Sequence, residues 1–346
     1  YFKDKVPSTP KECTFHITPN NYSTVRTYLM PNDYSHGPSW WNEKSAKYPK
    51  EYYTEIRLPT EQEIIDGRVG LNKSRKIKSL KELTDKSMQL RLDKELNANH
   101  EWKKLIAQKK MAVGVVDLSN PNDVKYANVN GDYMMYAASL PKIAVLLAAM
   151  DAIEKGQLKE TPEVTKDMKL MISNSNNEAS TRMIDRVGYA KIESVMTDDK
   201  YKLYDKTYGG LWVGKRYAAG GPTNREPLKH LSHAATVAQV CKYYYLLANG
   251  KLVNNERSKE MLDIMENPAL HHKFVNTLDL IAPDARLFRK SGSWKNFHSD
   301  SILVWGKDPK RRYILVALVD DALGEKIIRN LVKPVEKVLK NYYIDG

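Results

Sequence analysis

The chain has 346 residues, enough to bury a large core, and 42% of them are hydrophobic, as in ordinary globular proteins. No apolar run of about 18 residues occurs, so no transmembrane helix is expected. The formal net charge of +13 is scattered, with short basic clusters at Lys73–Lys81 and Lys310–Arg312. This charge predicts affinity for an anionic surface or substrate, such as a cell-envelope polymer, and no nucleic acid partner is expected.

The distant cysteines Cys13 and Cys241 allow at most one disulfide and form no metal-binding pattern.

The first 80 residues are rich in tyrosine, proline, asparagine and tryptophan and show little hydrophobic periodicity. Their aromatic content argues against plain disorder. We therefore expect an irregular N-terminal extension over residues 1–80 and one domain over residues 81–346. Within that domain, apolar residues recur at helical spacing from about Leu80 to Lys110.

A strand pair is predicted next. Met111–Leu118 is a short apolar run, Ser119–Asp123 is rich in turn-forming residues, and Val124–Val129 has the pattern of a second strand. The run Ile143–Met150 is apolar on nearly all sides and predicts a buried helix, which Gly156 is placed to end.

Residues 140 to about 280 are predicted to be mostly helical, with apolar helices at Lys166–Ile172 and Ala234–Leu247. Strand patterns and then an amphipathic helix from about Glu325 return late in the chain; the three strand candidates are Arg286–Lys290, Ser301–Trp305 and Tyr313–Val319. Early and late strands must meet in one sheet. We expect a mixed α/β fold, with an antiparallel sheet flanked by helices, an all-helical lobe over about residues 140–280, and a cleft between the two.

The segment before the buried helix carries a candidate nucleophile. Ser139 and Lys142 stand three residues apart, which places them on one helical face. A hydroxyl is a weak nucleophile until a base takes its proton, and a lysine desolvated against an apolar helix is a candidate for that base. We therefore expect the Ser139 hydroxyl within hydrogen-bond reach of Lys142. The S-x-x-K pattern alone is a weak signal, because Ser8–Lys11 matches it too, and an ordinary helix start is the alternative.

Two further motifs follow in order. Ser175-Asn176-Asn177 comes after an apolar helix, and Lys290-Ser291-Gly292 ends a predicted strand. S-x-x-K, S-D-N and K-T-G in this order are the signature of class A β-lactamases and penicillin-binding proteins. The chain resembles this family over about residues 85–343, with conservative replacements in two motifs. The resemblance implies a β-lactamase/transpeptidase-like fold and a serine hydrolase that works through an acyl-enzyme without a cofactor.

The resemblance also implies roles for the residues of the first two motifs. Ser139 would be the acylated nucleophile, and Lys142 the general base or the proton relay that activates it. Ser175 would pass a proton to the leaving nitrogen. Asn177 would bind the substrate amide or hold Lys142 in place.

The third motif would bind the substrate. Lys290 would supply positive charge for a substrate carboxylate, Ser291 a hydroxyl for it, and Gly292 would line the same site. The backbone N–H groups of Ser139 and Ser293 would form the oxyanion hole, where negative charge develops on the carbonyl oxygen. The implied partner is a small molecule or peptide that carries a carboxylate.

The histidines offer weaker signals. His298 lies just beyond the third motif, near the expected mouth of the cleft, where substrate contact competes with a plain surface role. His230, His233 and the pair His271-His272 have no carboxylate partner at a standard metal-ligand spacing, so no metal site is predicted.

The chain departs from class A β-lactamases at the residue that activates water. That family carries a glutamate followed four residues later by asparagine, between the second and third motifs. No glutamate between Asn177 and Lys290 has asparagine at that position. The corresponding region, Tyr208–Lys215, is rich in glycine and aromatic residues instead. Ser139 and Ser175 are also closer in sequence than is usual in the family, which predicts a shortened helical lobe.

Three interpretations remain open. The first is a serine hydrolase of an envelope peptide, amide or ester with weak or no β-lactamase activity, favoured because deacylation lacks its usual base. The second is a true β-lactamase with another water activator. The third is a non-catalytic protein that binds β-lactams or cell-wall fragments. An envelope substrate implies a periplasmic or otherwise extracytoplasmic location, although Tyr1–Asp4 shows no signal peptide.

Overall fold

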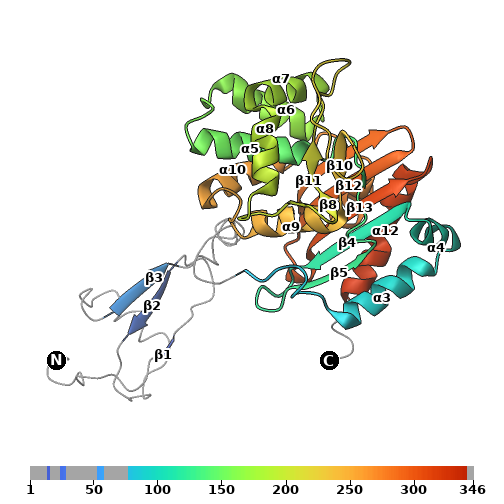
Figure 1. Ribbon diagram of the computed structural model, residues 1–346. Helices are drawn as coiled ribbons and strands as arrows, with labels where there is room; N and C mark the ends of the chain where they lie inside the picture. The colour runs from blue at the N-terminus through green and yellow to red at the C-terminus, as the bar shows by residue number, and fades with distance from the viewer. Residues whose placement is uncertain (1–13, 16–23, 29–52, 58–76, 341–346) are drawn as a thin grey trace, which may run out of the picture. The chain divides into compact units, whose positions relative to one another are not determined.

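The computed structural model describes residues 14–15, 24–28, 53–57 and 77–340, and the chain divides into two compact units, residues 1–67 and 68–346 (Figure 1). The first unit contains an antiparallel sheet of three short strands: β1 (Thr14–Phe15), β2 (Thr24–Tyr28) and β3 (Tyr53–Arg57). We expected an irregular extension here. The three strands are rich in β-branched and aromatic residues, which favour strands. Each is too short to show a clear alternation of apolar and polar residues. Ser8–Lys11 and Cys13 lie outside the described residues.

The second unit is built on a five-stranded antiparallel sheet in the order β11-β12-β13-β4-β5. Its strands are β4 (Met111–Asp117), β5 (Lys125–Val129), β11 (Arg286–Trp294), β12 (Phe297–Trp305) and β13 (Arg312–Asp320). The two early strands pair as a hairpin, and the late strands join them through the pairing of β13 with β4. The expected meeting of early and late strands in one sheet is confirmed.

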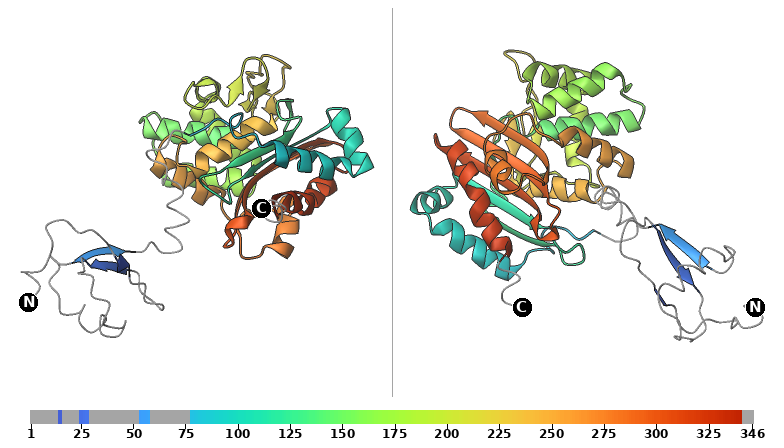
Figure 2. Two further views of the ribbon diagram at one scale, coloured as in Figure 1. Left: turned by 90° about the horizontal axis from the view of Figure 1, so that it is seen from below. Right: turned by 180° about the vertical axis from the view of Figure 1, so that it is seen from behind.

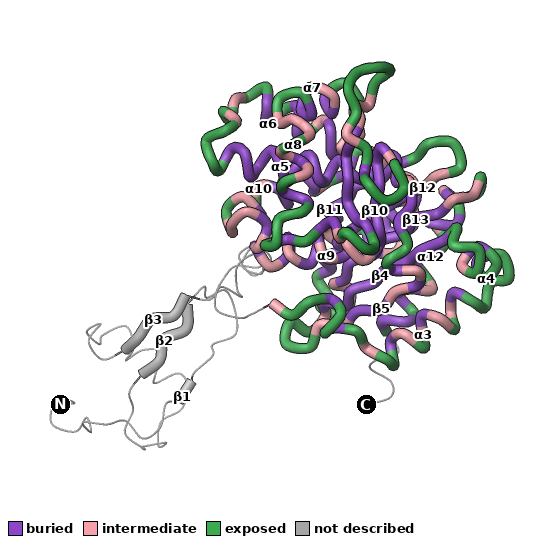
Figure 3. Tube along the Cα trace, viewed as in Figure 1, coloured by how far each residue is buried: buried purple, intermediate pink, exposed green. Residues whose placement is uncertain are grey.

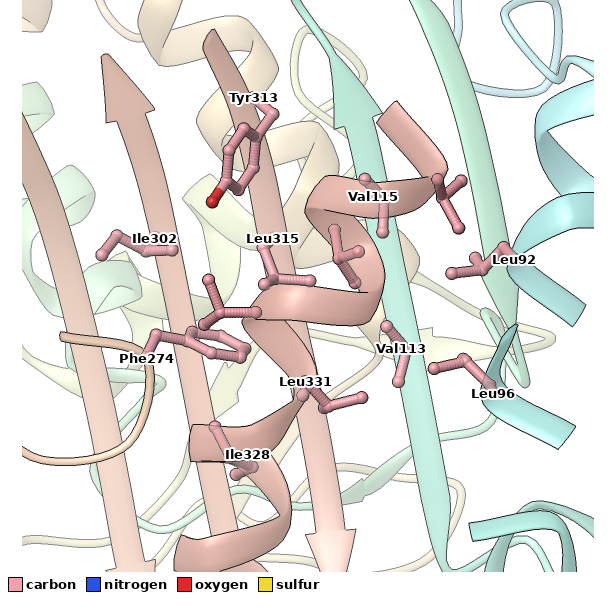
Figure 4. Packing of buried hydrophobic residues seen from close by; sticks show 14 of the residues in the cluster. Leu92, Leu96, Val113, Val115, Phe274, Ile302, Tyr313, Leu315, Ile328 and Leu331 are labelled. Carbon is pink, nitrogen blue, oxygen red and sulfur yellow. The ribbon is translucent and has the colours of Figure 1, made fainter. Parts of the chain in front are cut away.

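Helices cover both faces of this sheet (Figure 2). One face carries α3 (Lys86–Asn97), α11 (Phe274–Ile281) and α12 (Gly324–Lys340), and α9 (Val237–Ala248) lies on the other; α4 (His100–Ala107) connects α3 to β4. Figure 4 shows Ile328 and Leu331 of α12 over Val113 and Leu315 of the sheet. Burial of each such side chain contributes roughly 1.5–3 kcal/mol, which holds the layers together.

The helical lobe is arranged around α5 (Lys142–Glu154), whose residues from Lys142 to Ile153 are all buried (Figure 3). The helices that pack on it are α6 (Pro162–Ser173), α7 (Asn177–Val187), α8 (Tyr189–Thr197) and α10 (Asn255–Met265). This central position explains why α5 is apolar apart from Lys142, Asp151 and Glu154, because a helix surrounded by others has little surface for polar residues. Gly156, with φ of 67°, follows its end as expected.

One predicted helix begins later than expected. We expected Ala234–Leu247 to be helical from its first residue, but His233–Ala235 form β10, which pairs with β6 (Met135–Tyr136) and β9 (Trp212–Val213). The side chain of Thr236 accepts a hydrogen bond from the backbone N–H of Gln239 and caps α9, so the residues before it are extended. Among the described residues, no helix has the length and apolar character that crossing a bilayer requires.

Candidate active site

Ser139 lies in the turn between β6 and α5 and is half-buried. Ala138, just before it, has a φ of 50°, which an alanine rarely adopts. Two hydrogen bonds hold the turn: Ser299 Oγ of β12 donates to Ala137 O at 2.7 Å, and the Tyr217 hydroxyl donates to Ala138 O at 3.2 Å. The backbone that carries the Ser139 hydroxyl is therefore fixed from both the sheet and the loop before β10.

Lys142 is the first residue of α5, and its side chain is buried. Its ammonium donates to Ser175 O at 2.7 Å and to Asn177 Oδ1 at 2.9 Å, and it lies 3.4 Å from Ser175 Oγ. The expected hydrogen bond between Ser139 and Lys142 is not formed within the described part of the chain, because these oxygens hold the ammonium instead. Burial lowers the pKa of Lys142 to about 7, so a substantial fraction is free amine at neutral pH.

The second motif lies at the start of α7. Asn176 is the N-cap residue, and its side chain accepts a hydrogen bond from Ala179 N at 2.7 Å. Asparagine and aspartate cap helices about equally well, which explains why asparagine can stand where the family signature has aspartate. Ser175, with φ of 55°, directs its hydroxyl between two lysines, and Lys290 Nζ donates to it at 2.9 Å.

The third motif lies on β11, one of the two edge strands of the five-stranded sheet. Lys290 is buried, and burial together with the charge of Lys142 lowers its pKa well below the usual value. At Gly292 a Cβ atom would lie 2.5 Å from both Ser139 N and Ala137 O, so only glycine allows the strand to approach the turn this closely. Ser291 is buried opposite Asp300, whereas Ser293 is exposed. The structure thus brings all three motifs together.

Three aromatic residues beside the site carry no sequence motif. The ring centroid of Tyr217 lies 4.3 Å from Lys142 Nζ and 4.3 Å from the ring centroid of His233, and Tyr136 packs edge-on against His233. Burial raises the pKa of Tyr217 well above its usual value, so its hydroxyl stays protonated. Burial lowers the pKa of His233 to about 4, and its ring nitrogens contact Lys215 O and Ser232 Oγ, both at 3.0 Å. Neither side chain is a suitable base near neutral pH.

Glu226 lies in the loop before β10, and its carboxylate is occupied. It is fully buried and accepts four hydrogen bonds, from the Tyr204 hydroxyl and from the backbone N–H groups of Leu228, Lys229 and Leu231. Glu193 is bound to the side chain of Asn224. Within the described ranges, no carboxylate forms a hydrogen bond to Ser139 or Lys142. The hydrogen bonds of Glu226 and Glu193 therefore stabilise the loop before β10.

Acylation of Ser139 is expected to become faster as the pH rises through about 7. The reason is that the role of general base, which the resemblance implies for Lys142, requires a neutral amine, and the neutral fraction grows as the pH passes its pKa of about 7. The measurement is the second-order rate constant of labelling by a penicillin between pH 5.5 and 7.5, with the melting temperature recorded at each pH. A rate constant that does not change across this range contradicts the assignment of Lys142 as the base.

The chain is similar to known proteins in sequence pattern and in fold. Residues 97–169 and 161–343 match the model of the beta-lactamase enzyme family. A search of curated proteins finds no match. Among solved structures, a beta-lactamase from Sphaerobacter thermophilus DSM 20745 is similar, with 17% sequence identity and a TM-score of 0.55, covering 69% of this chain and 97% of that one. PBP-A is similar too, with 16% identity and a TM-score of 0.56, covering 76% of this chain and 98% of that one.

A point mutant of PBP-A, solved as an acyl-enzyme complex with penicillin G, is among these similar structures. At such low identities the likeness to solved structures concerns the fold alone. The family model, by contrast, matches most of the sequence and includes all three motifs. On that match, the chain belongs to the beta-lactamase enzyme family.

Proposed function

We propose that the protein is a serine hydrolase that forms an acyl-enzyme on Ser139. The observation that supports this best is the convergence on Ser175, whose hydroxyl lies 3.4 Å from Lys142 Nζ and 2.9 Å from Lys290 Nζ. A nucleophile, a lysine of lowered pKa and a hydroxyl that connects it to a second lysine are the parts that acyl transfer needs.

In the acylation step, the neutral amine of Lys142 takes the proton of Ser139, directly or through Ser175, and the serine oxygen attacks the substrate carbonyl. The N–H groups of Ser139 and Ser293 stabilise the resulting oxyanion. The bond from the carbonyl carbon to the leaving nitrogen then breaks, and Ser175 passes a proton to that nitrogen. Catalytic hydrogen bonds often tighten only when substrate is bound, which accommodates the present position of Lys142.

The charge of the site favours an anionic substrate. Lys290 and Lys142 lie close together, and Lys273 adds positive charge behind β11 and β12, whereas the charge of Arg289 is paired with Asp300. We infer that the substrate carries a carboxylate that Lys290, Ser291 and Asn177 help to bind. With the net charge of +13, this favours an envelope peptide, amide or ester and an extracytoplasmic location.

Hydrolysis of the acyl-enzyme is proposed to be slow. It needs a water molecule near the ester carbonyl and a base to deprotonate it. The ring of Tyr217 lies 4.3 Å from Lys142 Nζ on the side of the loop before β10, and Lys142 has already taken the proton of Ser139 in the acylation step. The glutamates of that region, Glu193 and Glu226, are engaged elsewhere.

A penicilloyl adduct on Ser139 is expected to persist for minutes or longer. A general base typically contributes about 10²–10⁴ in rate, so its loss leaves the ester intact long after it forms. The measurement is intact-protein mass spectrometry after mixing with excess penicillin and rapid removal of the free compound. Tyr243→Phe is the matched control, because the Tyr243 hydroxyl forms no hydrogen bond within the described residues and its loss should leave the adduct long-lived.

Other outcomes separate the alternatives. Turnover of nitrocefin above about 10 s⁻¹, an ordinary enzyme rate, contradicts slow deacylation and favours a true β-lactamase with another water activator. Binding of penicillin without any adduct contradicts the acyl-enzyme and favours a non-catalytic binding protein. A persistent adduct together with turnover of a simple ester supports the hydrolase proposed here.

A further inference from the structure

Lys273 is a buried lysine that belongs to none of the three motifs. It directly precedes α11, with φ of 56° and ψ of −127°, a conformation that residues with a side chain rarely adopt. Its side chain is fully buried, and its ammonium donates to Gly292 O at 2.5 Å, to Ser293 Oγ at 2.8 Å and to Ser299 O at 3.0 Å. An uncommon backbone conformation therefore places a cation directly behind the strand that contacts Ser139.

These contacts determine the direction of the peptide between Gly292 and Ser293. Gly292 and Ser299 are paired across β11 and β12, and one ammonium can reach both carbonyl oxygens only if both point into the space between the strands. A trans peptide is planar, so the N–H of Ser293 points opposite to the C=O of Gly292, off the free edge of β11. The turn of Ser139 lies beside this peptide, because a Cβ atom on Gly292 would lie 2.5 Å from Ser139 N.

The charge of Lys273 is not neutralised by an ion pair within the described residues. Asp300 is held by Arg289 through two bonds of 2.7 and 2.8 Å, and the Glu325 carboxylate accepts from the backbone N–H of Lys273 and from Arg329. The ionisable groups that interact with the ammonium are Asp300, Arg289, Glu325, His272, His298 and Lys290. Burial lowers the pKa of Lys273 to about 8, while Asp300 favours its charged form. Much of the positive charge therefore acts on the carbonyl of Gly292.

We propose that Lys273 is a positioning residue of the oxyanion hole: its ammonium holds and polarises the Gly292–Ser293 peptide so that the Ser293 N–H donates strongly to the carbonyl oxygen of an acyl group on Ser139. This deepens the proposed function and rests on it. A hydrogen bond accepted by a peptide carbonyl strengthens the N–H donor of the same peptide. Removal of an oxyanion donor costs about 10²–10³ in rate, and weakening one through its partner is expected to cost about tenfold.

The test is Lys273→Met, which keeps the volume of the side chain and removes its charge. The rate of acylation by penicillin is expected to fall about tenfold. The infrared band of the ester carbonyl in the acyl-enzyme should move to higher frequency, because the carbonyl loses hydrogen-bond strength. In the wild-type protein, acylation should decline above about pH 8 as Lys273 loses its proton, and this decline should be absent in the variant. A purely structural lysine would move neither the band nor the pH profile.

Two further variants make the result interpretable. Lys191→Met is the matched control, because it removes a half-buried lysine that pairs with Asp151 in the helical lobe and should leave the rate and the band unchanged. If Lys273→Met does not fold, Lys273→Gln retains a neutral donor, and its band should shift in the same direction by less. An unchanged band and rate in a folded Lys273 variant overturn this proposal alone. Failure of the wild-type protein to form any adduct overturns the proposed function and this proposal together.

Discussion

Replacement of Ser139 by alanine is expected to abolish covalent labelling by penicillins and fluorophosphonates, with a loss of about 10³-fold or more in acylation rate. The hydroxyl oxygen is the atom that becomes esterified, and the neighbouring hydroxyl of Ser175 is held by Lys290 Nζ at 2.9 Å rather than placed in the turn. The fold should survive, because the side chain is small and the turn is held by the carbonyls of Ala137 and Ala138. Intact-protein mass spectrometry and a fluorescent fluorophosphonate gel measure the loss.

Ser173→Ala is the matched control for this experiment. Ser173 ends α6, two residues before Ser175, and its hydroxyl contacts Asn267 O at 3.5 Å, outside the cluster of lysines. Labelling of this variant should equal that of the wild-type protein, and circular dichroism should be the same for both variants. Persistent labelling of a folded Ser139→Ala protein would show that another residue is the nucleophile.

Replacement of Lys142 by methionine is expected to slow acylation by about 10²–10⁴-fold, the usual contribution of a general base. Methionine is similar in length to the aliphatic part of lysine and fits an apolar position at the start of α5. The side chain cannot accept a proton, and Ser175 loses one of its two lysine partners. Stopped-flow measurement of acylation at pH 7.5 gives the loss, with Lys191→Met as the control that should keep the wild-type rate.

The same variant should also change how the stability of the folded protein depends on pH, which is independent of acylation. The pKa of Lys142 is lowered in the folded protein to about 7, so the unfolded chain binds more protons between about pH 7 and its usual pKa of 10.5. Burial of the charged lysine therefore lowers the free energy of unfolding by its full amount below pH 7. This destabilisation becomes smaller as the pH rises toward 10.5. Relative to the wild-type protein, Lys142→Met should be most stable at pH 6 and should lose most of this advantage by pH 9.5. A difference in melting temperature that is the same at both values contradicts the lowered pKa.

Much of the scaffold could be predicted from the sequence because its signals are local. The β4–β5 hairpin follows from a short apolar run, a turn cluster and a second run. The helix α5 follows from an uninterrupted apolar stretch, and each of the three late strands and α12 has its own pattern. The start of α9 was missed, because the extended residues before it pair with distant segments and show no local alternation.

The candidate nucleophile and the three motifs were also visible in the sequence, because the order of S-x-x-K, S-x-N and K-S-G along the chain is itself a pattern. What the sequence could not determine is the pairing of groups that only folding brings together. Ser175 and Lys290 are 115 residues apart yet share a hydrogen bond, and Lys142 bonds to the second motif rather than to Ser139. The positions of Tyr217 and Lys273 were decided by tertiary structure alone. Neither lies in a motif, and the burial that shifts their pKa values comes from packing between elements distant in the sequence.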